Sequence, residues 1–176
     1  MEESDDPTGL SGAELAAALD RGAAGVYATE AAVRLLVQHG TWLDRLADTG
    51  LIDTAVTGAG AGAGRRVVAE VRWDAAVTAS RDGTIAASGS ERAVLAVAAS
   101  LAAGTPVDLG DAIVGLDRAT VALVLAALSH AAGTHQDRDY LPDPPDTPGE
   151  PGVIRPDSPR LDLGPLFDWP PTSTAG

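Results

Sequence analysis

The 176-residue sequence contains no cysteine, no lysine and no asparagine, and it has only one phenylalanine. Without cysteine the chain cannot form a disulfide, a thiolate zinc site or an iron–sulfur cluster, and it has no cysteine nucleophile. Without lysine it cannot form a Schiff base, and it lacks the phosphate-binding lysine of Walker-type loops. Composition alone therefore excludes several classes of enzyme.

Long apolar runs are also missing. The N-terminus, MEESDDPTG, is acidic where a signal peptide needs a basic start. No stretch of about 18 apolar residues without charges follows it. We therefore expect a soluble, cytoplasmic protein that makes no contact with membranes.

The net charge of −13 comes mainly from the two ends of the chain. Residues 1–6 contain four acidic side chains, and residues 137–176 contain eight acidic side chains and three arginines. Ten of the twelve prolines also lie after residue 137, where they disfavour both helix and sheet. The sequence thus predicts a disordered acidic N-terminus at 1–10, a helical domain at 11–136 and a disordered, acidic, proline-rich tail at 137–176.

Capping and stop signals predict a mainly α fold, a small helical bundle. Ser11 with Glu14, and Ser88 with Glu91, match the capping box, in which the serine accepts from an amide of the first turn and the glutamate accepts from the cap amide. Other helices are expected to follow caps and to stop at glycines, with the caps at Thr29, Asp108 and Asp117 and the stops at Gly40, Gly104 and Gly133.

Two stretches rich in β-branched residues, 51–57 and 67–73, leave room for a short β-hairpin. The run TGAGAGAG at residues 57–64 matches the glycine loop TGxxxGxG of short-chain dehydrogenases, and this resemblance implies a dinucleotide site. That family also uses a tyrosine and lysine pair, and it needs a helix after the loop. This chain has no lysine, and a predicted strand follows the loop. We interpret the run as an Ala/Gly linker and expect no cofactor.

Residues 91–133 resemble the helix-turn-helix half of winged-helix repressors, most clearly in LDRATV at residues 116–121. The resemblance implies that the helix opening at this phrase enters the major groove, with Arg118 and Thr120 as DNA contacts. Beyond Arg118 this helix carries no basic or amide side chain for phosphates or base edges, and the acidic tail repels phosphates. A DNA-binding regulator is therefore an alternative function, with nucleic acid the less favoured partner.

The helix expected at 118–132 is apolar around most of its circumference. Such a helix must either be central to a core or be covered by a partner. A homo-oligomer formed through this helix and a tail folded over it are both open interpretations.

The tail contains an apolar segment, RLDLGPLFDW at residues 160–169, after the proline-rich spacer. Disordered chains that keep such anchors use them to bind a partner groove. The spacing LxLGxL resembles the C-terminal loading peptides of encapsulin cargo proteins, although Pro165 and the acidic and aromatic residues after Leu166 depart from that pattern. The partner-binding residues predicted on this segment are Leu161, Leu163, Leu166, Phe167 and Trp169.

The sequence predicts neither a catalytic residue nor a metal site. Of its three histidines, His39, His130 and His135, the last two are five residues apart and so do not share a helix face as metal ligands would. The patterns HGTWLDR, RWDAAV and SERAVLAVAASLAAGTPVDLGDAIVGLD resemble a group of small uncharacterised actinobacterial proteins over about residues 28–133, a resemblance that implies no activity. We therefore expect a non-enzymatic interaction or regulatory protein that binds a protein partner through its tail, with DNA binding and encapsulin loading as alternatives.

Overall fold

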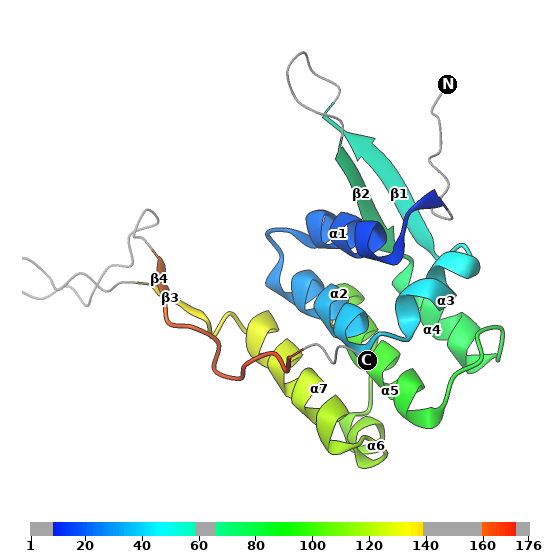
Figure 1. Ribbon diagram of the computed structural model, residues 1–176. Helices are drawn as coiled ribbons and strands as arrows, with labels where there is room; N and C mark the ends of the chain where they lie inside the picture. Colours follow the sequence, from blue (N-terminus) through cyan, green and yellow to red (C-terminus); the bar gives the residue numbers. More distant parts are fainter. Residues whose placement is uncertain (1–8, 59–65, 139–159, 172–176) are drawn as a thin grey trace, which may run out of the picture.

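The computed structural model describes residues 9–58, 66–138 and 160–171 (Figure 1). Within these ranges the chain forms seven helices and two two-stranded antiparallel sheets. The prediction of a mainly helical fold with one short hairpin is confirmed. The disorder predicted at 1–10 and 137–176 falls largely on residues 1–8, 139–159 and 172–176, which lie outside the described residues.

The elements follow one another in a simple order along the chain. They are α1 (Gly12–Ala23), α2 (Tyr27–His39), α3 (Trp42–Asp48), β1 (Ile52–Thr57), β2 (Arg66–Val71), α4 (Trp73–Arg81), α5 (Gly89–Ala103), α6 (Leu109–Val114), α7 (Arg118–Ala131), β3 (Gln136–Arg138) and β4 (Arg160–Asp162).

Local signals set several of the helix ends. Both predicted capping boxes are present, and in α5 the Ser88 amide donates to Glu91 at 2.6 Å while the Glu91 amide donates to the Ser88 hydroxyl at 3.2 Å. Gly40 and Gly104 end α2 and α5 in the left-handed conformation that glycine adopts without strain, with φ of 77° and 69°.

The predicted start of α2 at Thr29 is wrong. The helix already begins at Tyr27, and Thr29 lies inside its first turn. The carboxylate of Glu30 instead accepts a hydrogen bond of 2.7 Å from the amide of Gly25. Val26 occupies the cap position of α2, and no side chain hydrogen-bonds to the first-turn amides there.

Helix α4 is absent from the predicted elements. The sequence suggests a strand up to residue 73, but β2 ends at Val71 and Trp73 opens a helix. Trp73, Ala76, Val77 and Ser80 are buried on one face of that helix. This spacing is helical, and the burial it provides outweighs the β propensity of the residues before it.

The core lies around α2, which packs mainly against α5 and α7 (Figure 1). The indole of Trp42 is completely buried within it. The hairpin pairs Ile52 with Val71 at one end and Thr57 with Arg66 at the other, and α1 lies on β2. That contact requires the glycine inside α1, because a Cβ atom at Gly22 would lie 2.1 Å from the carbonyl oxygen of Ala69.

Helix α7 turns one face to α2 and the other outward. Val124 and Ala127 are buried, whereas Leu125 and Leu128 are exposed. The helix therefore lies at the side of the bundle, with its apolar outer face only partly covered. None of the helices among the described residues is both long enough and apolar enough to span a membrane.

Candidate docking site

The described part of the tail folds back onto the domain. Strand β4 pairs antiparallel with β3, so that Gln136 faces Asp162 and Arg138 faces Arg160. One residue further on, the amide of Leu163 donates to the carbonyl of His135 at 2.9 Å. This short pairing, which the sequence did not predict, attaches the start of the apolar segment to the end of α7.

Trp169 attaches the other end of the segment. Its ring is partly buried against the hydrophobic core. The guanidinium carbon of Arg34, on α2, lies 4.7 Å from the ring centroid, and the imidazole of His130, on α7, lies tilted to it with centroids 6.4 Å apart. A cation–π contact of this kind contributes about 0.5–1 kcal/mol at an exposed site. Trp169 thus packs on its own domain.

Between these two attachments the chain turns and presents its apolar side chains to solvent. Gly164 adopts φ of 71°, and its amide donates to Asp162 Oδ1 at 3.0 Å. After this turn Leu166 is 69% exposed and Phe167 is 47% exposed, and Leu163 before it is 61% exposed. Three of the five predicted partner-binding residues are therefore accessible on one short segment, while the side chain of Leu161 lies outside what the structure describes.

Aromatic side chains from the start of α2 and from the end of α7 and the turn after it form a cluster next to this segment. The imidazoles of His130 and His135 stack with centroids 4.5 Å apart and planes 6° apart. Tyr27, at the start of α2, meets both rings edge-on, and its hydroxyl donates to the amide oxygen of Gln136. The end of α7 and the start of β3 are thus held against α2.

The spacing of the two histidines concealed this stack. A five-residue separation places two side chains on different faces of a continuous helix, but α7 ends at Ala131 and the chain reverses at Gly133, with φ of 71°. The reversal brings His135 back over His130. Gly133, predicted as a helix stop, was the available signal for it, although a helix stop alone does not give the direction of the next residues.

Charged side chains of both signs surround this aromatic cluster. His130 Nε2 lies 3.0 Å from Glu30 Oε2. Burial acts to raise the pKa of the Glu30 carboxyl, but the hydrogen bonds with His130 and from the Gly25 amide, together with the electrostatic effect of the nearby His130 and His135, hold this pKa below its usual value. A cavity of about 430 Å³ lies beside them, lined by Arg34, His130, His135, Asp162, Pro165, Asp168 and Trp169. No group of three His, Asp or Glu residues in the described part of the chain is placed to hold a metal ion.

The two residues suggested for DNA contact differ in their exposure to solvent. Arg118 is exposed at the first position of α7, whereas Thr120 is only 7% exposed and its side chain packs inward. The amide of Thr120 donates to Asp117 Oδ1 at 2.7 Å, which confirms Asp117 as the cap of α7. Of these two predicted residues, Arg118 is exposed to solvent and Thr120 is not.

The strands on either side of the glycine run are antiparallel neighbours, β1 and β2. A dinucleotide-binding loop instead connects a parallel strand to a helix. Residues 59–65 of the run lie outside the described residues. The flanking strands therefore agree with the linker interpretation.

No protein-family model matches the chain, and no match was found among curated proteins or solved structures. Its function must therefore be inferred from the geometry of its own residues.

Proposed function

We propose that the protein is a non-enzymatic interaction protein whose C-terminal segment, residues 160–171, docks on a partner protein. The observation that carries this proposal is the exposure of Leu163, Leu166 and Phe167 on a segment attached to the domain at both ends. An attached segment has already lost much of the conformational entropy that a free peptide loses on binding. The three side chains are then available at low cost as anchors.

The side chains of the segment indicate which kind of partner surface would bind it. Burying a large apolar side chain completely contributes about 1.5–3 kcal/mol, so three partly exposed anchors suffice for specific binding when the groove fits them. Asp162 and Asp168 are exposed beside the anchors. The partner is therefore a protein with an apolar groove bordered by arginine or lysine side chains.

A shell protein of the encapsulin type is one partner of this kind. Leu163 and Leu166, two of the leucines in the LxLGxL pattern, are among the exposed anchors. Loading into a shell and docking on a soluble partner use the same side chains, and the size of the captured assembly distinguishes them.

The test replaces the three anchors by serine in the full chain, as L163S, L166S and F167S together. We expect the variant to keep the wild-type melting temperature, because these side chains are exposed, and to lose the complex that the wild-type chain forms in lysate of its own host. Val114→Ser is the matched control, because Val114 is 85% exposed on α6 and lies outside the segment. A purified partner that binds the triple variant as tightly as the wild type would contradict the proposal.

A further inference from the structure

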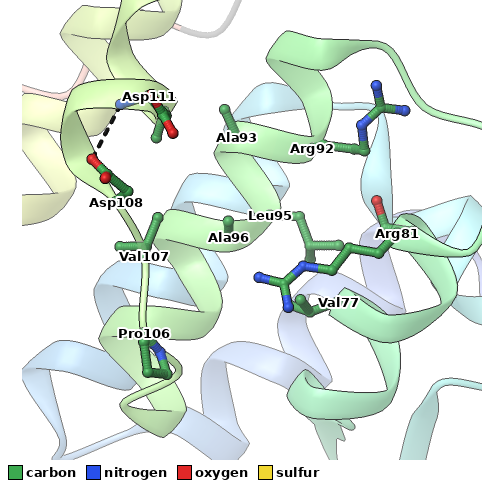
Figure 2. Close-up of a pocket in the computed structure, with 12 residues that line it drawn as sticks. Val77, Arg81, Arg92, Ala93, Leu95, Ala96, Pro106, Val107, Asp108 and Asp111 are labelled. Carbon is green, nitrogen blue, oxygen red and sulfur yellow. Dashed lines mark hydrogen bonds between the residues drawn. The ribbon is translucent and has the colours of Figure 1, made fainter.

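A groove separate from the C-terminal segment lies between α4, α5 and the chain that leads into α6 (Figure 2). Its volume is about 320 Å³, at the lower end of the range of about 300–1,000 Å³ that small-molecule sites occupy. The small side chains of Ala93 and Ala96 line the groove on α5, and Pro106 and Val107 line it on the chain that leads into α6. Val77 and Leu95 add further apolar lining.

Unpaired polar groups line this apolar hollow. Arg81, the last residue of α4, points its guanidinium into the groove, and it forms no hydrogen bond or ion pair with any described residue (Figure 2). Its neighbour Ser80 also lines the groove, is 3% exposed and has a buried hydroxyl without a hydrogen-bond partner in the described part of the chain. Buried polar groups are normally satisfied, so the hydroxyl of Ser80 is a candidate for a bound partner, whereas the guanidinium of Arg81 is exposed and available to a ligand in the groove.

The opposite side of the groove is acidic. Asp108 uses Oδ1 to cap α6, accepting from the amides of Gly110 at 2.9 Å and Asp111 at 3.3 Å. The carboxylate of Asp111 has no hydrogen-bond or ion-pair partner among the residues that the structure describes. Arg81 and Asp111 therefore place opposite, unpaired charges on the two sides of α5 (Figure 2).

We propose that this groove binds a small zwitterionic molecule, with its carboxylate on Arg81, its amine on Asp111 and an apolar middle along Ala93 and Ala96. A simple anion would meet repulsion from Asp108 and Asp111, and a simple cation would meet repulsion from Arg81. Only a ligand with both charges satisfies both ends. Charge-assisted hydrogen bonds at each end then fix its direction. This binding site is independent of the docking proposal.

The test uses ε-aminocaproate and the shorter γ-aminobutyrate as probes, with caproate and hexylamine as molecules that each lack one charge. Amide chemical shifts of the full-length protein are followed by NMR during titration. We expect a zwitterion to shift the amides of residues 92–96 and 106–112 at millimolar concentration, and each singly charged molecule to bind about tenfold more weakly, since one charged hydrogen bond is lost.

Matched variants assign the ends of the ligand. Arg81→Gln and Asp111→Asn should each weaken zwitterion binding about tenfold, and Asp111→Asn should not weaken binding of caproate. Arg92→Gln is the control, because Arg92 lines the same groove but turns away and donates to the carbonyl of Ala87 at 2.6 Å. No shift with either zwitterion would overturn the proposal, and so would equal losses in Arg81→Gln and Arg92→Gln, which indicate a nonspecific charge effect.

Discussion

At the scale of single residues, Trp169 decides whether the C-terminal segment is held or free. Its ring contacts the guanidinium of Arg34, lies near the imidazole of His130 and is partly buried on the core. We expect Trp169→Ala to lower the free energy of unfolding by about 1–2 kcal/mol, because it removes both the cation–π contact and part of the apolar burial. Urea denaturation measures this change.

Trp169→Phe is the matched control for that substitution. It keeps an aromatic face for Arg34 and should recover most of the lost stability. Proteolysis of the alanine variant should also cut residues 160–171 faster than the wild type. Unchanged stability and unchanged cleavage in Trp169→Ala would show that the ring does not attach the segment in solution.

At the scale of elements, the cap of α5 makes stability depend on pH. The hydrogen bond from the Ser88 amide, helped by Arg45, lowers the pKa of Glu91 to about 2 from its ordinary value of 4.5. A carboxylate with a lowered pKa stabilises the fold fully above its unfolded pKa, and this contribution is lost as the pH falls through the folded pKa. We expect Glu91→Gln to cost about 0.5–1 kcal/mol at neutral pH, because glutamine still caps but carries no charge.

The difference between wild type and Glu91→Gln should shrink as the pH falls from 4.5 towards 2. Urea denaturation at several pH values measures it. Asp48→Asn, at an exposed carboxylate at the end of α3, is the matched control for loss of one negative charge. A difference that stays constant with pH would mean that the charge of Glu91 does not stabilise the helix.

The elements also show which features of the fold can be predicted from local sequence. Both capping boxes were predicted correctly, because serine and glutamate three residues apart satisfy each other without help from the rest of the chain. Helix α4 was missed because burial of Trp73 against the core, not local propensity, sets its start. The pairing of β3 with β4 was missed because it joins residues far apart in sequence, across residues 139–159.

The candidate docking site could likewise be predicted only in part. Its anchors were predicted because Leu163, Leu166 and Phe167 stand out in a proline-rich tail. The position of Trp169 on its own domain could not be predicted, since it depends on Arg34, which lies more than a hundred residues earlier in the sequence. Composition thus identified the segment, and only the tertiary structure divided its residues between attachment and exposure.

At the scale of the whole molecule, attachment of the segment to the domain affects stability, whereas its docking on a partner affects binding. If residues 160–171 were free, their removal would leave the stability of the domain unchanged. Because β4 pairs with β3 and Trp169 packs on the core, we expect a chain ending at residue 159 to melt about 3–8 °C lower than the wild type. Differential scanning calorimetry measures the shift.

Comparison with two other chains separates the two roles. A chain ending at residue 171 keeps β4, the anchors and Trp169, and should melt like the wild type. The triple serine variant should also melt like the wild type but lose the partner, whereas the chain ending at residue 159 should lose both stability and partner. If the shorter chain melted like the wild type and still lost the partner, the segment would act as a free peptide, and its attachment to α2 and α7 would contribute nothing to docking.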